Sequence, residues 1–180
     1  MSEFHKMKIA GLDRALEKFP VSDKLDIAAF ILFGDVEVTV AAASQLLKKV
    51  PEFDYIITPE AKSIPLAYEM ARQSGKPYIV IRKGVKVYMR DPVSVTVRSI
   101  TTAKEQKLFI GMEDVEKIQG KRVLIVDDVI STGESLSAVR ELVGKTGATE
   151  VAACAVLAEG DAAERTDIIF LEKLPLFFKD

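Results

Sequence analysis

Residues 123–135 contain the side chains of this chain whose types and spacing best support chemistry. They read Val-Leu-Ile-Val-Asp-Asp-Val-Ile-Ser-Thr-Gly-Glu-Ser. The adjacent carboxylates of Asp127 and Asp128 can accept hydrogen bonds from vicinal hydroxyl groups. The hydroxyl of Ser131 and the backbone N–H groups around Gly133 suit an anion instead, and glycine lets the backbone approach that anion closely. A ligand that satisfies both halves is a sugar phosphate.

The elements around this stretch must position it. The apolar run from Val123 to Val126 predicts a strand buried on both faces. Leu136, Val139 and Val143 lie at helical spacing after the loop and predict a helix. Because the first turn of a helix has free N–H groups and the positive end of the dipole, the loop that precedes it favours an anion.

Two structural alternatives compete with this interpretation. A buried strand that ends in a solvated acidic turn explains the apolar run, but not the acid pair beside a hydroxyl loop. A receiver domain also has an acidic pair after an apolar strand, but early in the chain, before strands that carry a phospho-acceptor Asp and a Lys. This chain ends at Asp180, too soon after Asp128 for that order of elements.

The stretch resembles the ribose-5-phosphate loop of the type I phosphoribosyltransferases, which bind phosphoribosyl pyrophosphate (PRPP). The resemblance extends over roughly residues 20–178, and only 123–135 is highly specific. It implies that Asp127 and Asp128 are catalytic, because they hold the ribose hydroxyls and stabilise positive charge at the anomeric carbon. It also implies that the 5-phosphate binds to Ile130, Ser131, Thr132, Gly133, Glu134 and Ser135. Glu134 departs from purine enzymes that have glycine there, although other type I branches vary at this position.

A second loop, Glu60-Ala61-Lys62-Ser63, also lies between a strand pattern and a helix pattern. The resemblance makes it the pyrophosphate loop, with lysine in place of the commoner arginine and serine in place of glycine. Lysine neutralises a diphosphate as a point charge and not as a bidentate fork. The alternative is an ordinary helix N-terminus, with Glu60 near the dipole and Lys62 solvated.

Arg82 and Lys83 follow the next strand pattern. Adenine phosphoribosyltransferases and their archaeal purine relatives have a similar basic pair, which implies that these two side chains face the pyrophosphate. The alternative is a solvated basic turn.

Residues 93–110 have the pattern of an antiparallel hairpin, because Val93, Val95 and Val97 alternate with polar residues before a polar tip. The resemblance makes this hairpin the flexible flap that closes over the site and keeps water away. Adenine-type enzymes often have a Glu-Tyr pair there, which this chain lacks. Either Glu105 takes the acid–base role or this role is absent. The resemblance also implies that Lys104 contacts the pyrophosphate. The alternative is that residues 104–107 form a solvated turn.

Base recognition in the family comes from an N-terminal hood and from residues near the last strands. The positions that correspond are Leu25, Asp26, Ile27, Leu157 and Glu159. No motif separates adenine from hypoxanthine, guanine or xanthine. The overall likeness favours adenine.

The remaining patterns alternate between helix and strand. Helices are expected at Ile9 to Phe19, along Val40, Ala43, Leu47 and Val50, and along Ile64, Ala67, Tyr68 and Ala71. Strands are expected at 55–58, 77–81, 151–157 and 168–171. Repeated strand–helix units predict an α/β fold with a parallel sheet flanked by helices. The resemblance makes it the type I phosphoribosyltransferase fold, one domain over 1–180 with hood elements at about 1–35 and a flap at about 90–110.

Composition bounds the function. Apolar residues make up 48% of the 180, enough for one core, and the net charge of −2 gives no general case for nucleic acid. We expect no membrane span and no secretory signal, and therefore a cytoplasmic protein. Cys154, the only cysteine, lies in an apolar run and is expected to be buried, so disulfides and thiolate zinc sites within the chain are excluded. The only histidine, His5, argues against Ser–His–Asp and Cys–His chemistry.

The expected function is therefore transfer of phosphoribosyl from PRPP to a purine base, with release of pyrophosphate, in purine salvage. Mg²⁺ is the expected cofactor, bridging pyrophosphate and ribose oxygens with few protein ligands. Because type I enzymes are commonly dimers, we expect a homodimer. The alternatives are transfer to hypoxanthine, guanine, xanthine or orotate, and a non-catalytic PRPP-sensing regulator.

Overall fold

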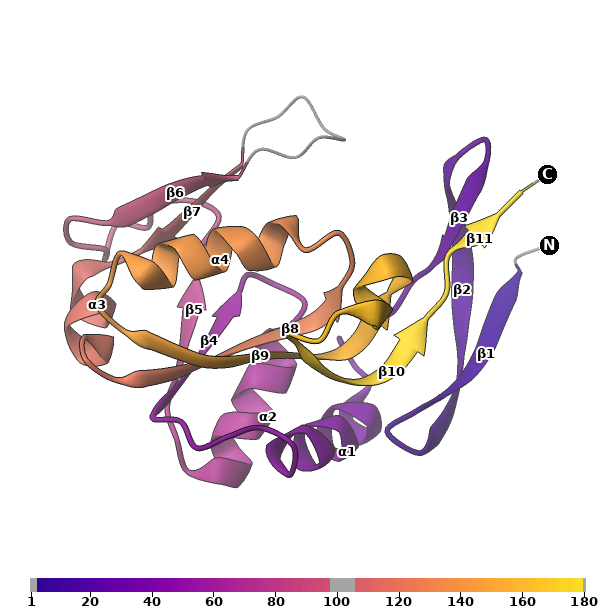
Figure 1. The fold of residues 1–180 in the computed structure, drawn as a ribbon, viewed down its shortest axis with the longest axis horizontal. Coiled ribbons are helices and arrows are strands. Elements are labelled where there is room, and N and C mark those ends of the chain that lie inside the picture. Colours follow the sequence, from indigo (N-terminus) through magenta and orange to yellow (C-terminus); the bar gives the residue numbers. More distant parts are fainter. Residues whose placement is uncertain (1–2, 98–105, 180) are drawn as a thin grey trace.

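A parallel sheet forms the centre of the molecule (Figure 1). The computed structural model describes residues 3–97 and 106–179. The sheet has the order β10-β9-β8-β4-β5 and all of its neighbouring strands are parallel. Its strands are β4 (Tyr55–Pro59), β5 (Tyr78–Ile81), β8 (Arg122–Ile130), β9 (Thr149–Glu159) and β10 (Ile169–Leu174). This is the α/β architecture that the alternating patterns predict.

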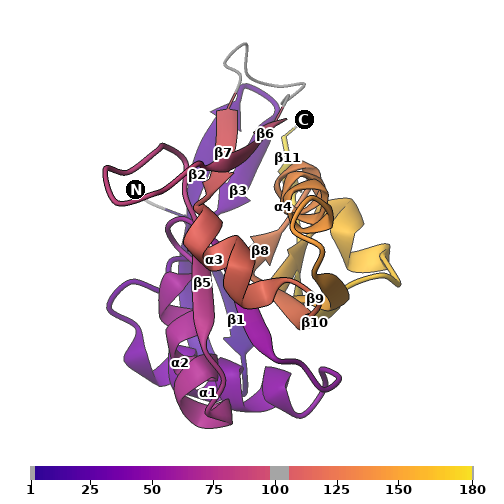
Figure 2. The same cartoon turned by 90° about the vertical axis from the view of Figure 1, so that its left-hand side faces the viewer.

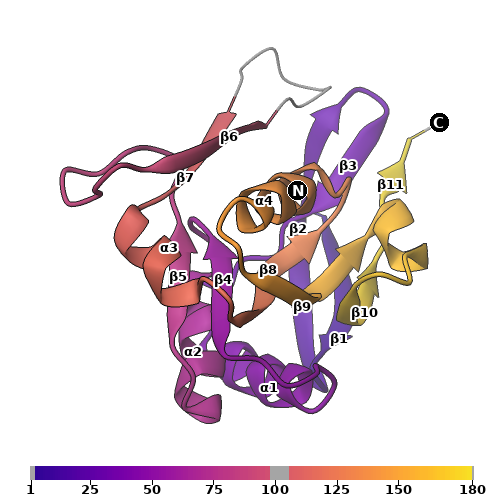
Figure 3. The same ribbon diagram turned by 60° about the vertical axis from the view of Figure 1, so that its left-hand side comes forward.

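Helices cover both faces of this sheet. On one face lie α1 (Val36–Leu47) and α2 (Ile64–Ser74), and on the other lies α4 (Glu134–Gly144), as Figure 3 shows. The short helices are α3 (Met112–Ile118) and the 3₁₀ helix η1 (Gly160–Glu164), neither of which the patterns identify. In the described part of the chain no helix combines the length and the apolar character needed to cross a membrane.

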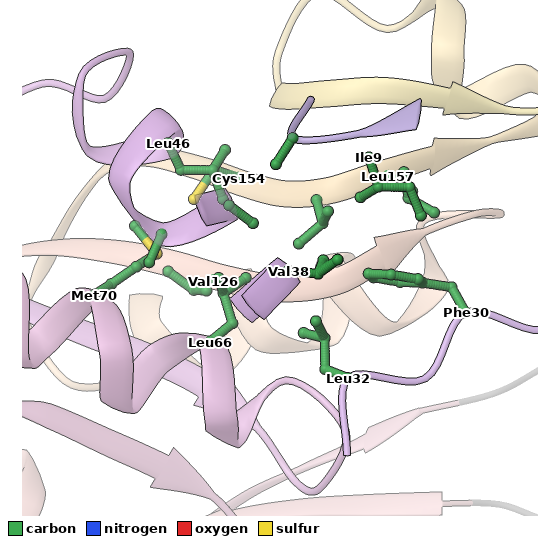
Figure 4. Close-up of a cluster of buried hydrophobic side chains, with 14 of the residues drawn as sticks. Ile9, Phe30, Leu32, Val38, Leu46, Leu66, Met70, Val126, Cys154 and Leu157 are labelled. Atoms are coloured by element: carbon green, nitrogen blue, oxygen red, sulfur yellow. The ribbon is translucent and has the colours of Figure 1, made fainter. Parts of the chain in front are cut away.

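Two apolar clusters, one on each face, hold the layers together. The first joins α1 and α2 to the sheet, and its side chains interdigitate around Val126 and Cys154 (Figure 4). Cys154 is fully buried, as expected. The second cluster packs Leu136, Val139 and Val143 of α4 against the sheet, which confirms the face predicted for that helix.

A separate antiparallel sheet corrects the expectation for the N-terminus. Residues 9–19 were expected to be helical, but they belong to a hairpin. Its sheet has the order β1-β2-β3-β11, made of β1 (Phe4–Ile9), β2 (Leu12–Ser22), β3 (Leu25–Ala28) and β11 (Phe177–Phe178). Ala10 and Gly11 both have positive φ, 51° and 86°, which suits a two-residue hairpin turn. The period of two along Leu12, Arg14 and Leu16 then turns alternate side chains inward.

The faces of α1 and α2 were only partly predicted. The helices form where expected, but the buried residues of α1 are Val38, Thr39, Ala42, Ala43 and Leu46. Val40 is 40% exposed. Asp35 is the N-cap of α1, and its side chain accepts a hydrogen bond from Val38 N (3.1 Å). The buried face of α1 is therefore rotated slightly from the face predicted along Val40, Ala43 and Leu47. On α2, Ala67 is buried as expected, but Tyr68 is 56% exposed.

The expected hairpin is confirmed by β6 (Val93–Val97) and β7 (Gln106–Ile110), which pair antiparallel with Val95 opposite Leu108. Figure 2 shows this hairpin on the side of the molecule that also holds α3 and β5. Strand β7 extends the sheet locally, because Arg82 and Phe109 exchange backbone hydrogen bonds of 2.9 and 2.8 Å.

Candidate active site

The site lies where the winding of the parallel sheet reverses. From β4 the chain passes through α2 to β5 on one side, and it later returns to β8 on the other side of β4. Helices α2 and α4 leave β4 and β8 on opposite faces, so their connecting loops diverge at the carboxyl ends of the two strands (Figure 3). Ligands of open α/β sheets bind in the crevice at such a point.

A cavity of about 520 Å³ occupies this crevice. It is lined by both loops that were singled out in the sequence and by one residue of the hairpin, Leu108. The predicted site residues that line it are Glu60, Ala61, Lys62, Lys83, Asp127, Asp128, Thr132, Glu134 and Ser135. The structure thus brings together residues from three separate segments of the chain.

The loop predicted to bind phosphate, residues 130–135 (the phosphate loop), forms the turn from β8 into α4. Gly133 has φ of 83°, in the left-handed region, and its position directly before α4 requires that conformation. Thr132 and Ser135 are exposed toward the cavity, and Glu134 N donates a weak hydrogen bond to Thr132 Oγ1 (3.4 Å). Ile130 is 3% exposed and packs in the core, which leaves its backbone for any contact with a ligand.

The acid pair lies within β8, because the strand continues to Ile130, beyond the predicted end at Val126. Asp128 is 4% exposed, and its Oδ2 accepts no hydrogen bond from the residues that the structure describes. Lys62 Nζ lies 3.5 Å from that oxygen. This ion pair links the acid pair to the second loop.

Asp127 has a strongly perturbed pKa. Removal from water raises its pKa well above the ordinary value, and the neighbouring charge of Asp128 raises it further. Asp128 N donates a hydrogen bond to Asp127 Oδ1 (2.9 Å), which partly offsets the rise. Hydroxyl donors or a cation that reach these two carboxylates would stabilise their ionised forms.

Buried hydroxyls hold the pyrophosphate loop, residues 60–63, against β8. Thr58 Oγ1 lies 2.7 Å from Ser63 Oγ and 2.8 Å from the Val126 carbonyl oxygen, and Ser63 Oγ donates to the Pro59 carbonyl (2.9 Å). Thr58 and Ser63 are 0% and 1% exposed. The loop is thereby fixed beside the acid pair, and the Glu60–Ala61 peptide within it is cis.

The basic pair lies beside the same loop. Glu60 Oε1 is 3.4 Å from Arg82 Nη2, and Glu60 Oε2 accepts a hydrogen bond from Lys83 N (3.0 Å). Arg82 Nε is buried and makes no hydrogen bond within the described residues. Arg82 therefore has an unused donor, although only Lys83 of the pair lines the cavity.

The residues expected at the base are not gathered in this cavity. Leu25, Asp26 and Ile27 lie on β3, where Asp26 Oδ1 is 2.6 Å from Lys179 Nζ. Leu157 is fully buried in the core beside Ile9 (Figure 4), and Glu159 ends β9. Their roles in base binding stay predictions.

Two further residues expected in the site, Lys104 and Glu105, lie outside the described residues. Their assignments to the pyrophosphate and to acid–base chemistry therefore also stay predictions.

Some site residues were not singled out in the sequence. Thr58 looked like an ordinary strand residue, and Leu108 like a hairpin residue. Arg165, 30% exposed, lies against the phosphate loop, and a Cβ built on Gly133 would collide with its guanidinium. Nothing in the spacing along the chain connects residue 165 with 133, because their proximity depends on β8 and β9 being neighbours.

Within residues 3–97 and 106–179, no group of three or more His, Cys, Asp or Glu side chains could hold a metal ion. A metal in this cavity would therefore draw on the two aspartates and on oxygen atoms of a ligand or water.

Comparison with known proteins agrees with this geometry. The family model described as "Phosphoribosyl transferase domain" matches residues 38–174. A hypoxanthine/guanine phosphoribosyltransferase of Methanococcus voltae is 33% identical over 147 residues, which is 81% of this chain and 72% of the relative. An adenine phosphoribosyltransferase of Thermotoga petrophila is 37% identical over 108 residues, or 60% of each chain.

Among solved structures, the adenine phosphoribosyltransferase of Thermoanaerobacter pseudethanolicus has the same fold. It superposes with a TM-score of 0.74 at 22% identity, covering 88% of this chain and 95% of that chain. The enzyme from Saccharomyces cerevisiae, crystallised with a bisphosphate imino-altritol and adenine, superposes with a TM-score of 0.70 over 87% of this chain and 93% of that chain, again at 22% identity.

Proposed function

The chain belongs to the phosphoribosyltransferase family, and from this premise we propose that it transfers phosphoribosyl from PRPP to a purine base and releases pyrophosphate. The proposal rests mainly on the cavity at the carboxyl ends of β4 and β8, where the winding of the parallel sheet reverses. A phosphate loop, a crowded acid pair and a loop with a cation meet there, and PRPP contains one partner for each.

The 5-phosphate would bind to the N–H groups and hydroxyls of residues 131–135, at the positive end of the α4 dipole. Asp127 and Asp128 would accept hydrogen bonds from the two ribose hydroxyls. These hydroxyls would supply the donors that Asp128 Oδ2 lacks among the described residues. Binding would thus relieve part of the cost of burying two like charges.

In the reaction, a base nitrogen forms a bond to the anomeric carbon while the bond from that carbon to the pyrophosphate oxygen breaks, and its electron pair leaves with pyrophosphate. The base nitrogen loses its proton to pyrophosphate or to the proposed acid–base group, Glu105. Positive charge develops on the sugar, and the carboxylates of Asp127 and Asp128 stabilise it. Lys62, Arg82 and Lys83 would neutralise the leaving group. The remaining contribution is positioning, and the described residues that line the cavity include no histidine or cysteine.

Mg²⁺ is part of this proposal. The carboxylates of Asp127 and Asp128 have the hard oxygen atoms that this ion prefers, and Asp128 Oδ2 accepts no hydrogen bond from the described residues. They would hold the ion directly or through the ribose hydroxyls, with diphosphate and water oxygens as its other ligands. When bound, Mg²⁺ neutralises charge on the diphosphate.

The hairpin β6–β7 is proposed as the flap. Leu108 already lines the cavity, and β7 pairs with Arg82, so a movement of the hairpin would reach the pyrophosphate cations. Lys104 would then meet the pyrophosphate and Glu105 would serve as the acid–base group. A change in the pH dependence of kcat in Glu105→Gln would support that role, and an unchanged profile would refute it.

We propose adenine as the acceptor, on the overall likeness described above, with Leu25, Asp26, Ile27, Leu157 and Glu159 near the base. Among the relatives, one is named for hypoxanthine and guanine and another for adenine, so the acceptor must be measured. A homodimer in the cytoplasm is proposed on the likeness to type I enzymes.

The test is a spectrophotometric assay with PRPP, Mg²⁺ and each purine in turn, with orotate as a competitor. We expect turnover of at least one purine, with adenine preferred and orotate inert. Turnover of orotate alone would replace the purine assignment, and PRPP binding without turnover of any base would favour a sensing role.

A further inference from the structure

Residues 127–135, which include the loop before α4, contain no lysine or arginine. A phosphate bound there would meet N–H groups, hydroxyls and the helix dipole, while the nearby Lys62 already lies 3.5 Å from Asp128 Oδ2. A cation that reaches the loop from elsewhere in the fold would add a charge-assisted hydrogen bond to the phosphate.

Arg165 is a cation in the right place. It directly follows η1, which begins where β9 ends, and β9 is the neighbour of β8 in the sheet (Figure 1). A Cβ added to Gly133 would collide with Nη1 of Arg165, so the guanidinium lies directly against the backbone of the loop. The absence of a side chain at residue 133 makes room for it.

The other nitrogens of this guanidinium are already in use. Arg165 Nε donates to Asp167 Oδ1 (2.9 Å) and Nη2 donates to Asp167 Oδ2 (2.7 Å), a bidentate pair. Nη1, the nitrogen that faces Gly133, makes no hydrogen bond with any residue in the described ranges. Nη1 therefore offers two N–H donors on the side that faces the loop.

Asp167 is itself fixed to the helix that the loop precedes. Arg140 of α4 donates to Asp167 Oδ2 (2.6 Å) from Nη1 and to the Asp167 carbonyl (3.2 Å) from Nη2, and its Nε contacts Glu150 of β9 (2.9 Å). The guanidinium of Arg165 is thus held in a set orientation by a chain of ion pairs based on α4 and β9. Such preorganisation lowers the cost of binding an anion.

We propose that Arg165 is a further substrate-binding residue, which donates a charge-assisted hydrogen bond from Nη1 to the phosphate held by residues 131–135. The proposal rests on the function proposed above, because that function makes the anion a sugar 5-phosphate. Arg165 would then act on the affinity for the phosphoribosyl half of PRPP and not on that for the pyrophosphate half.

The experiment compares binding of ribose 5-phosphate and of pyrophosphate by calorimetry in the full chain and in Arg165→Gln. Affinity for ribose 5-phosphate should fall by roughly tenfold or more, the loss expected for one hydrogen bond between charged groups. Affinity for pyrophosphate should change by less than about twofold, because pyrophosphate is proposed to bind near Lys62 and Lys83, beyond hydrogen-bond distance of Arg165. KM for PRPP should rise in parallel.

Lys173→Gln is the matched control, because it also removes a positive charge near η1, where Lys173 Nζ contacts Glu164 (2.7 Å), but away from the loop. If Arg165→Gln unfolds, Arg165→Lys replaces it. Arg165→Lys keeps the positive charge but lacks the planar guanidinium with its several donors, so it should bind ribose 5-phosphate several-fold more weakly.

Ribose 5-phosphate binding within twofold of the parent, or an equal loss for both ligands, would overturn the role of Arg165. Failure of the parent chain to bind ribose 5-phosphate would overturn the proposed function itself, together with this inference.

Discussion

Asp127 and Asp128 are two neighbouring carboxylates whose mutual repulsion lowers the stability of the fold, although both are proposed to act in the reaction. The pKa of Asp127 is raised by burial and by the charge of Asp128, so the folded protein holds that proton more tightly than the unfolded chain does. Stability therefore falls as pH rises from the unfolded pKa through the folded one, and the loss is complete above it. Lys62 and the Asp128 N–H offset part of the unfavourable environment of Asp127, and a bound ligand would relieve more of it.

Asp127→Asn should consequently be more stable than the parent at pH 7. The amide cannot ionise, its oxygen can still accept from Asp128 N, and its NH₂ group can donate to the Asp128 carboxylate. The excess in melting temperature should shrink as pH falls toward about 4, where the unfolded-chain carboxyl takes up its proton. Thermal unfolding monitored by circular dichroism across this pH range checks it.

Activity should move the other way in the same variant. We expect kcat to fall by about 10² or more, the loss typical for removal of one preorganised charge at a transition state. Glu52→Gln, an exposed acid before β4, is the control and should change neither quantity. A variant that is less stable than the parent at pH 7, or that keeps its activity, would contradict this account of the pair.

Much of the site was predictable at the residue scale. The acid pair, the glycine before α4 and Lys62 were all singled out from local pattern, because each lies between an apolar strand pattern and a helix pattern, although β8 continues past the acid pair to Ile130. Thr58 and Arg165 could not be identified, since their contacts join segments that are distant in sequence. The residues proposed to contact the base lie on β3 and β9, which belong to different sheets, and a local pattern contains no signal for the packing between sheets.

At the element scale, the pyrophosphate loop depends on the join between β4, α2 and β8. The Thr58 hydroxyl bridges the Ser63 hydroxyl and the Val126 carbonyl, with no exposure to solvent. This small network holds Lys62 near Asp128 while the rest of the loop faces the cavity.

Thr58→Val keeps the shape of the side chain and removes the bridge. We expect a loss of about 1–2 kcal/mol in the free energy of unfolding, because Ser63 and the Val126 carbonyl lose a buried partner. KM for PRPP should also rise by several-fold, since Lys62 is no longer held. Urea denaturation and steady-state kinetics measure the two effects.

Thr39→Val provides the comparison. Thr39 is 7% exposed and its hydroxyl donates to the Asp35 carbonyl (2.7 Å) on α1, outside the residues that line the cavity. It should lose comparable stability with KM unchanged. If both variants raise KM equally, the effect of Thr58 is a general loosening of the fold and not a positioning of the loop.

Elements with a clear period and clear ends were predicted well, and the antiparallel pair of β6 and β7 is the best example. The N-terminal hairpin was missed because Ile9, Leu12 and Leu16 also fit a helical spacing. The turn at Ala10-Gly11, with positive φ at both residues, decided between the two, and glycine after a small residue was the available signal. Helix α3, with seven residues, is too short for its period to be distinctive.

At the scale of the whole molecule, the order of the strands creates the site. Because β8 lies between β4 and β9, the acid pair has the pyrophosphate loop on one side and η1 with Arg165 on the other. The alternating patterns predicted a parallel sheet but not this order, which follows from long-range packing of the two apolar clusters. A different order of the same strands would separate the three groups.

We propose that these groups together transfer phosphoribosyl from PRPP to a purine. The most direct measurement follows PRPP, Mg²⁺ and adenine with the full chain by ³¹P nuclear magnetic resonance, with hypoxanthine and guanine in parallel. We expect the PRPP signals to decline only when a base is present, while pyrophosphate and a nucleoside monophosphate appear in equal amounts. PRPP that remains intact with every purine, in a folded sample, would contradict it.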